Sequence, residues 1–391
     1  MLKLVLGASG SGKTTLLYAR IRARAEAGKR SILLVPEQFT SSTEARIYRE
    51  LGDALSGMVE SYSFTSLAEH ILAIEGGAAV QTLTDAGRAV LVRRALEELQ
   101  DNVHYYYRHR RSAAFCQMAA ETIDELKSAG LSGQQLQELA RDCGTESAKL
   151  GELALIFQGY ESLLAGTGMD PADRLELAAD RLEAALARDE LPDFLREREV
   201  FIDEFDTFNA PKKRLMGAML AALPAVTVAL CEDGAPMQPG DLELFSGAKQ
   251  VAAQLRQLAR KNGAQVAAPE LLRRDLRHKD APGLAALTEL LETGSCTPPE
   301  SAPELRLFAA ASREEEARCA AAAIRRLMRQ GVRCGKIAVV CRDISLYRAA
   351  VRYEFRMAEI PLYCDGTHHP GVQRPPPRRC GHCWHCCGVR T

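Results

Sequence analysis

Short apolar runs alternate with amphipathic stretches at the start of the chain. Residues 1–6 form an apolar run suited to a buried strand, and residues 13–27 follow helical spacing with Gly28 placed to end the helix. A second strand is predicted at 32–35, where Pro36 ends it, and a third at 58–62. This strand–helix–strand order predicts a parallel sheet with right-handed crossovers.

Helical spacing dominates from about residue 66 to residue 194. The clearest apolar stripe runs from Leu150 to Leu164, and strand character returns only at 200–202 and 226–230. A stretch of roughly 130 residues is far longer than an ordinary connection. We therefore expect one α/β domain, formed by residues 1–66 and 195–300, that is split by a helical insertion at 67–194.

A second domain is predicted after a linker rich in proline and charge at 297–304. A strand at 305–308, a helix at 313–329 and a strand at 337–340 follow it. This order indicates the beginning of another α/β domain, which we place at 301–366.

Composition narrows the class of protein only moderately. The 391 residues are 47% hydrophobic and 26% charged, and 50 basic side chains against 51 acidic ones leave a net charge of −1. A nucleic-acid-binding surface would therefore have to be a local patch. No run approaches the roughly 20 apolar residues of a membrane helix, and the first residues do not resemble a signal peptide. We expect a cytoplasmic protein that does not bind membranes.

A glycine-rich loop between the first strand and the first helix carries the strongest chemical signal. Its backbone N–H groups and the helix N-terminus suit phosphate oxygens, while a lysine reaches the outer phosphates and a hydroxyl binds Mg²⁺. A chance glycine turn is the alternative, but eight matched positions between a strand and a helix argue against it. The predicted ATP contacts are Gly7, Ala8, Ser9, Gly10, Ser11, Gly12, Lys13, Thr14 and Thr15, with Thr14 also a metal ligand.

Two carboxylates follow the predicted strand at 200–202. ATP hydrolysis requires a carboxylate that holds the metal and often a second one that orients the attacking water. Asp203 is the candidate for Mg²⁺, and Glu204 is the candidate catalytic residue. A buried strand that ends in a solvated acidic turn is the alternative interpretation.

Several segments together resemble the AddB subunit of bacterial AddAB helicase–nucleases. Val35-Pro36-Glu37-Gln38-Phe39-Thr40 is similar to the block after that family's first helix, and Ser63–Ala68 to its next block. Ile202–Phe208 matches its second nucleotide motif, and segments at 314–317, 337–342 and 360–363 match the start of its second motor-like domain. The resemblance extends from residue 1 to about residue 366.

The resemblance implies a P-loop NTPase with a UvrD-like helicase fold that processes double-strand DNA ends for recombinational repair. It implies an AddA-type partner, Chi-type sequence recognition, and a nuclease domain with an iron–sulfur cluster beyond the end of this chain. It also implies that loops after the sheet strands contact single-stranded DNA. The candidate contacts are Gln38, Thr40, Phe64 and Phe208, and ordinary core packing is the alternative for both phenylalanines.

Two departures from related motors bear on turnover. No adenine-reading glutamine motif precedes Gly7, and residues 230–234 lack the glutamine that senses the outermost phosphate. A motor's second lobe also supplies an arginine to the reaction, and Arg342 is not at that position. We expect ATP binding with very slow hydrolysis. The alternatives are an ATP-driven translocase, an interaction subunit with a vestigial site, and a small-molecule kinase.

Two basic runs and a cysteine-rich tail remain. His104–Arg111 mixes aromatic and basic residues as strand-binding surfaces do, although a helix end with a solvated basic face is the favoured interpretation. A solvated basic face is also the favoured interpretation of a second basic run, formed by Arg273, Arg274, Arg277, His278 and Lys279. Residues 367–391 contain Cys380, Cys383, Cys386 and Cys387. These could suggest zinc, but ligands this crowded cannot easily surround one ion. We expect instead a reading-frame error or a truncated gene model, because GC-rich DNA read out of frame yields Arg, Pro, Cys and His.

Overall fold

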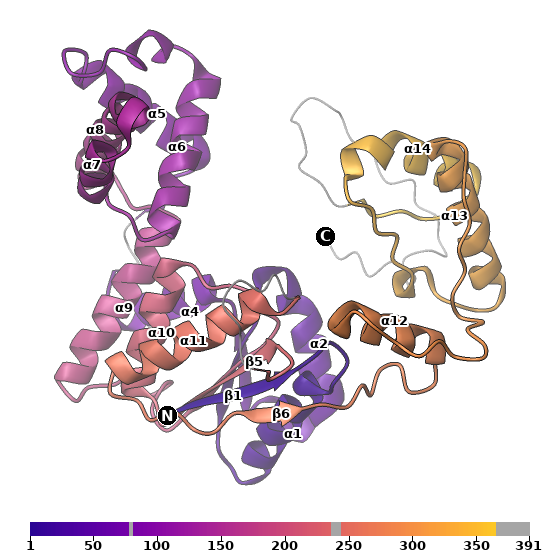
Figure 1. Ribbon diagram of the computed structural model, residues 1–391. Helices are drawn as coiled ribbons and strands as arrows, with labels where there is room; N and C mark the ends of the chain where they lie inside the picture. The colour runs from indigo at the N-terminus through magenta and orange to yellow at the C-terminus, as the bar shows by residue number, and fades with distance from the viewer. Residues whose placement is uncertain (78–80, 236–243, 365–391) are drawn as a thin grey trace. The chain divides into compact units, whose positions relative to one another are not determined.

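The computed structural model describes residues 1–77, 81–235 and 244–364, and the chain divides into two compact units at Ala302 and Pro303. The first unit contains a six-stranded sheet in which every pairing is parallel, in the order β3-β2-β4-β5-β1-β6. Figure 1 labels β5, β1 and β6, which lie side by side. The predicted parallel sheet is therefore confirmed. Its strands are β1 (Leu2–Gly7), β2 (Ser31–Leu34), β3 (Val59–Tyr62), β4 (Glu199–Ile202), β5 (Ala225–Cys231) and β6 (Glu270–Leu272).

The first two strands of the sequence are not neighbours in the sheet, because β5 and β4 lie between β1 and β2. Parallel strands end at the same edge, so the segments that follow β1, β2 and β4 meet there although they are distant in sequence. β6, which the sequence pattern did not indicate, pairs with the other side of β1 and aligns Leu272 with Gly7.

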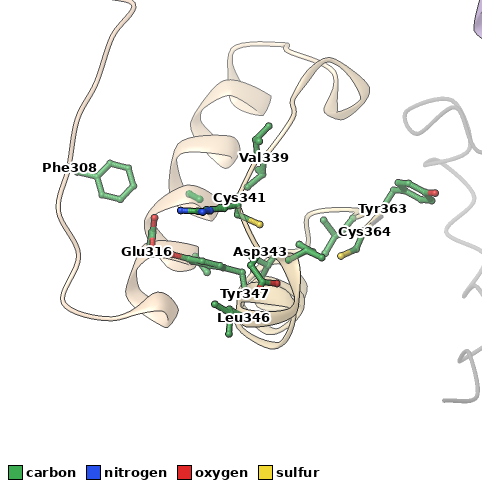
Figure 2. A pocket seen from close by; sticks show the side chains of 16 residues that line it. Phe308, Glu316, Val339, Cys341, Asp343, Leu346, Tyr347, Tyr363 and Cys364 are labelled. Atoms are coloured by element: carbon green, nitrogen blue, oxygen red, sulfur yellow. Dashed lines mark hydrogen bonds between the residues drawn. The ribbon is translucent and has the colours of Figure 1, made fainter. Parts of the chain in front are cut away.

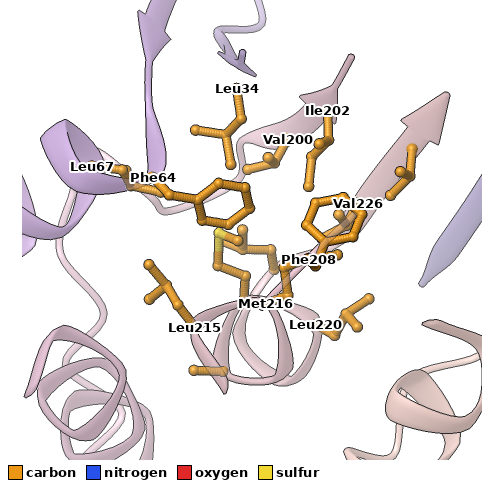
Figure 3. Close-up of a cluster of buried hydrophobic side chains, with 14 of the residues drawn as sticks. Leu34, Phe64, Leu67, Val200, Ile202, Phe208, Leu215, Met216, Leu220 and Val226 are labelled. Atoms are coloured by element: carbon orange, nitrogen blue, oxygen red, sulfur yellow. The ribbon is translucent and has the colours of Figure 1, made fainter. Parts of the chain in front are cut away.

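Helices cover both faces of the sheet, which explains why its strands are apolar on both sides. Leu4, Leu34 and Ile202 face a core formed with α4, α9, α10 and α11 (Figure 3), whereas Val5, Leu33 and Phe201 face a second core against α1 and α2. The bounds are α1 (Lys13–Glu26), α2 (Thr40–Leu51), α4 (Phe64–Glu75), α9 (Pro171–Ala187), α10 (Ala210–Ala222) and α11 (Ser246–Lys261). The unit also contains the short α3 (Asp53–Ser56) and α12 (Pro282–Thr293).

Four further helices form a cluster with a core of its own, around the buried Phe157 and Tyr160. The Tyr160 hydroxyl donates a 2.7 Å hydrogen bond to Asp170 Oδ1, and Lys127 Nζ lies 2.9 Å from the other oxygen of that carboxylate. These bonds link the cluster to the start of α9, which packs on the sheet. The cluster consists of α5 (Asp85–Glu98), α6 (Ala113–Ser128), α7 (Gly133–Arg141) and α8 (Ser147–Leu164).

The described part of the second unit is built on two helices, α13 (Arg313–Arg329) and α14 (Ile344–Met357), which pack around Phe355. The predicted helix at 313–329 is confirmed, but the strands predicted at 305–308 and 337–340 are wrong. Both segments lack strand structure, and Leu307 and Val340 are almost completely exposed. Apolar segments form strands only when another strand pairs with them, and within the described range none does so here.

No helix in the described ranges has the length and apolarity needed to cross a bilayer.

Candidate nucleotide-binding site

The loop between β1 and α1 has the backbone geometry that its glycines permit. Gly10 and Gly12 have φ angles of 84° and 91°, in the region that side chains with a Cβ rarely occupy. A Cβ on Gly7 would lie 2.7 Å from the Leu272 carbonyl oxygen of β6. The loop thus curls tightly over the end of the sheet, and α1 begins directly after it at Lys13.

The side chain of Lys13 folds back over this loop. Its Nζ donates hydrogen bonds of 2.7 Å to the Gly7 carbonyl and 2.8 Å to the Ala8 carbonyl. Burial lowers the pKa of Lys13, while the nearby Asp203 acts in the opposite direction. The ammonium group is therefore partly desolvated, which strengthens its attraction to any anion in the loop.

Asp203 and Glu204 extend from the end of β4 toward the same cavity as Lys13. That cavity has a volume of about 540 Å³, and Gly10, Gly12, Thr14 and Thr15 also line it. Asp203 is buried, and its Oδ1 accepts a 3.0 Å hydrogen bond from the backbone N–H of Glu204. Glu204 has a φ of 65°, a conformation that costs most residues about 1–2 kcal/mol. Partial burial and the adjacent Asp203 raise the pKa of Glu204.

Two arginines that we did not predict also line this cavity. Arg277 follows β6 and donates a 3.1 Å hydrogen bond from Nη1 to the Ser9 hydroxyl, while the N–H of Leu276 donates to the Gly10 carbonyl at 3.0 Å. Arg46, on α2, holds its guanidinium 4.7 Å from the centre of the Tyr18 ring. The basic run at 273–279 was a signal for Arg277, but nothing indicated that β6 would carry it to the loop.

The residues around this cavity fit a nucleoside triphosphate with Mg²⁺. The Ser11 hydroxyl oxygen is buried under the loop beside Gly7 and has no hydrogen-bond partner within the described chain. Lys13, Arg46 and Arg277 supply positive charge for phosphates, and Thr14 and Asp203 supply hard oxygen atoms suited to Mg²⁺.

The four predicted DNA contacts fall into two groups. Gln38 and Thr40 lie directly after β2, at the sheet edge that carries the glycine loop; Gln38 is exposed and Thr40 half-buried. Phe64 and Phe208 are only 2% and 4% exposed and pack edge to face in the core (Figure 3). Core packing, the alternative for these phenylalanines, is what the structure shows. Phe39, between Gln38 and Thr40, is exposed instead.

A larger hollow, of about 1300 Å³, lies within the second unit (Figure 2). Val339, Leu346, Tyr363 and Phe308 give it a mainly apolar wall, and Glu316, Arg342 and Asp343 are its charged lining residues. It borders the extended segments that lack strand partners. The hollow is thus a mainly apolar surface beside segments that have no strand partner in the described range.

A metal centre built from clustered side chains does not occur in the described residues: no three His, Cys, Asp or Glu side chains lie close enough to hold one. The cysteines at 380–387 lie outside the described residues.

These groups lie on a strand, a glycine loop and a helix at the edge of a parallel α/β sheet. This arrangement is typical of nucleotide-binding proteins, and the chain is a candidate member of that class. Residues 4–288 match the family model described as "ADDB, N-terminal". The chain therefore belongs to the AddB family.

Three relatives, each named as the B-type component of an "ATP-dependent helicase/deoxyribonuclease", show the extent of the similarity. Those of Moorella thermoacetica and Desulforudis audaxviator are 33% and 34% identical, and that of Symbiobacterium thermophilum is 32% identical. Each alignment covers 95% of this chain but 33% of the relative. The chain thus spans about a third of the length of these relatives.

Proposed function

We propose that this chain is the ATP-binding, single-strand-handling part of a helicase–nuclease subunit. The observation that carries the proposal is the convergence of Lys13, Asp203, Glu204 and Arg277 on one cavity at the carboxyl edge of the sheet. This is a P-loop site in the manner of UvrD-like helicases, and the family membership favours it over the small-molecule kinase.

Each side chain has a distinct part in nucleotide binding. The N–H groups of residues 7–15 and the ammonium of Lys13 would hold the phosphate chain, and Arg277 would add charge from the opposite side of the loop. Thr14 and Asp203 would hold Mg²⁺, which neutralises phosphate charge. The raised pKa of Glu204 suits a group that takes a proton from water as the water attacks.

The DNA-handling part of the proposal rests on the segment after β2. Gln38 and Thr40 would hydrogen-bond a base edge or a phosphate, and the exposed ring of Phe39 offers the stacking surface that Phe64 and Phe208 lack. These residues lie at the same sheet edge as the glycine loop, so the nucleotide and the single strand would bind at one edge of the sheet, although β4 and β5 lie between the strands that carry them.

The wider role extends beyond this chain. The names of the relatives describe one subunit of a helicase/deoxyribonuclease, which supports a complex with at least one other subunit. We further propose that the partner is AddA-type, that the complex processes double-strand breaks in the cytoplasm, and that it includes Chi-type recognition. The nuclease domain and its iron–sulfur cluster would belong to the two thirds of the relatives that this chain does not span.

An active ATP-driven translocase is the second candidate, and Arg46 and Arg277 favour it. In two-lobed motors the arginine that stabilises the transition state comes from the second lobe, and for that reason the sequence predicts slow hydrolysis. The first unit itself, however, places two arginines, Arg46 and Arg277, at the cavity. An arginine that stabilises the developing charge contributes roughly 10³- to 10⁵-fold in rate.

Measuring ATP binding and ATP hydrolysis with and without single-stranded DNA, alone and with an AddA-type partner, tests both candidates. Binding with negligible hydrolysis by the chain alone supports the proposed function. DNA-stimulated hydrolysis of several turnovers per second would favour the translocase, and absence of ATP binding would refute both.

A further inference from the structure

The connection between α5 and α6 gathers aromatic and basic side chains at one place on the helical cluster. Residues 104–111, hereafter the YR loop, read His-Tyr-Tyr-Tyr-Arg-His-Arg-Arg. Helix α5 ends at Glu98 and α6 begins at Ala113, so this segment is a loop with one short 3₁₀ turn at Tyr107–His109 rather than a helix end.

A single carboxylate from α8 fixes the conformation of the YR loop. The Glu152 side chain accepts hydrogen bonds of 2.8–3.1 Å from the backbone N–H groups of His104, Tyr105 and Tyr106. Burial acts to raise the pKa of Glu152, but these N–H groups together with the nearby His104 side chain leave it below its usual value. Tyr106 stacks on Phe115 with ring centres 5.5 Å apart. The loop is thus organised before any ligand binds, which reduces the entropic cost of binding.

The arginines of the YR loop are not neutralised. Within the described chain, Arg108, Arg110 and Arg111 have no carboxylate partner, whereas the exposed Arg93 and Arg94 on neighbouring α5 pair with Glu97 and Glu98. In a chain with a net charge of −1, three such arginines create a local positive field.

Aromatic faces alternate with these charges. The Arg108 guanidinium lies 5.5 Å from the centre of the Tyr105 ring, and that of Arg110 lies 3.9 Å from the centre of the Tyr107 ring. Tyr105 is 43% exposed. An adjoining cavity of about 380 Å³ has Val90 in its wall and is also lined by Arg93, Arg110 and Arg111.

We propose that the YR loop and this cavity form a second binding surface for single-stranded nucleic acid. Tyr105 would stack on a base, while Arg108, Arg110 and Arg111 would contact successive phosphates; this combination suits single strands because every base has a π face. A partner that is merely acidic would use the arginines but would gain little from the tyrosines. The inference rests on the DNA-handling part of the proposed function and adds a contact region outside the sheet.

Fluorescence anisotropy of the full chain with a labelled oligothymidylate, at several salt concentrations, tests the proposal. Replacing the three arginines together (Arg108→Gln, Arg110→Gln, Arg111→Gln) is expected to weaken binding at least about tenfold. It should also lower the slope of log K against log salt by about 2, since each phosphate contact contributes roughly 0.7. Tyr105→Ala is expected to weaken binding about fivefold or more without changing the slope.

Matched controls separate this surface from general effects. Arg94→Gln removes an exposed arginine that is paired with Glu98, and Tyr353→Ala removes an exposed tyrosine of the second unit. Both should bind like the unaltered chain, and ATP binding by the triple variant should be unchanged because the nucleotide cavity is elsewhere.

Wild-type affinity and slope in the triple variant would overturn the inference while leaving the proposed function intact. Displacement of the oligonucleotide by polyglutamate at equal charge would also overturn it, by showing an unspecific anion surface. If the unaltered chain binds no single-stranded DNA, the DNA-handling part of the proposed function fails as well.

Discussion

The guanidinium of Arg277 donates a hydrogen bond to the hydroxyl of Ser9 over a separation of 268 residues. The pairing of β6 with β1 makes this contact possible, because it places Leu272 beside Gly7 and directs the next residues across the glycine loop. Asp275 stabilises the turn, since its Oδ1 accepts hydrogen bonds from the N–H groups of Arg277 and His278. The proposed phosphate-binding region is therefore assembled from both ends of the first unit.

Replacing Arg277 by alanine is expected to weaken ATP binding about tenfold, because a charged hydrogen bond contributes about 1.5–3 kcal/mol. Titration with a fluorescent ATP analogue measures the change. Arg274→Ala is the matched control, since Arg274 is exposed, belongs to the same basic run and does not line the cavity. Equal losses in both variants would indicate a general effect of charge instead of a contact.

Replacing Lys13 by alanine is expected to abolish measurable ATP binding without unfolding the chain. Among the described residues the ammonium donates hydrogen bonds only to the Gly7 and Ala8 carbonyls of the loop, so the sheet and its two cores do not depend on it. Calorimetry with ATP and a thermal melt measure the two properties. Unchanged ATP affinity would contradict the assignment of the loop as a phosphate site.

The extended segments of the second unit are expected to bind a hydrophobic dye such as ANS. Leu307 and Val340 are almost completely exposed and lie in segments whose neighbours border the apolar hollow. Leu307→Lys with Val340→Lys should reduce ANS fluorescence severalfold. Leu291→Lys, at an exposed leucine of α12 outside these segments, should leave it nearly unchanged. Equal fluorescence in all three proteins would show that these segments are covered in solution.

The sequence predicted the site through local patterns and missed what depends on pairing at a distance. Gly7–Thr15, Asp203 and Glu204 follow strands that their apolar runs reveal, so the order of elements placed them at one sheet edge. The short β6 has no comparable run, and its position became evident only from its pairing with β1. The opposite error occurred at 337–340, where an apolar run suggested a strand but no strand pairs with it in the described range.

The phenylalanines show a second limit. Phe64 and Phe208 follow strands, as residues that contact a ligand at a sheet edge do, but spacing alone does not determine which way a ring points. Both rings turn into the core, where Phe205 stacks on Phe208 with ring centres 5.4 Å apart. Phe39, by contrast, lies in the short turn Glu37–Phe39, in which no residue is buried.

Replacing Glu204 by glycine is expected to stabilise the fold while abolishing the slow ATP hydrolysis expected of this site. The φ of 65° is strained for glutamate and free of strain for glycine. The strain energy removed should exceed the entropic cost of ordering glycine on folding. The free energy of unfolding should therefore rise by up to about 1 kcal/mol. Glu204→Gln retains the strain and loses only the carboxylate, so it should also stop hydrolysis but lack that gain.

The pH dependence of stability provides an independent check on Glu204. Burial and Asp203 raise its pKa in the folded chain, so the folded state retains this proton more tightly than the unfolded state. The contribution of Glu204 to stability is therefore greatest below the unfolded pKa and falls as pH rises through the window just above it. In Glu204→Gln and Glu204→Gly, this contribution to the fall in the free energy of unfolding with rising pH should disappear. Urea unfolding at several pH values measures it. Parallel pH profiles for the unaltered chain and both variants would contradict the raised pKa, and a less stable glycine variant would contradict the strain.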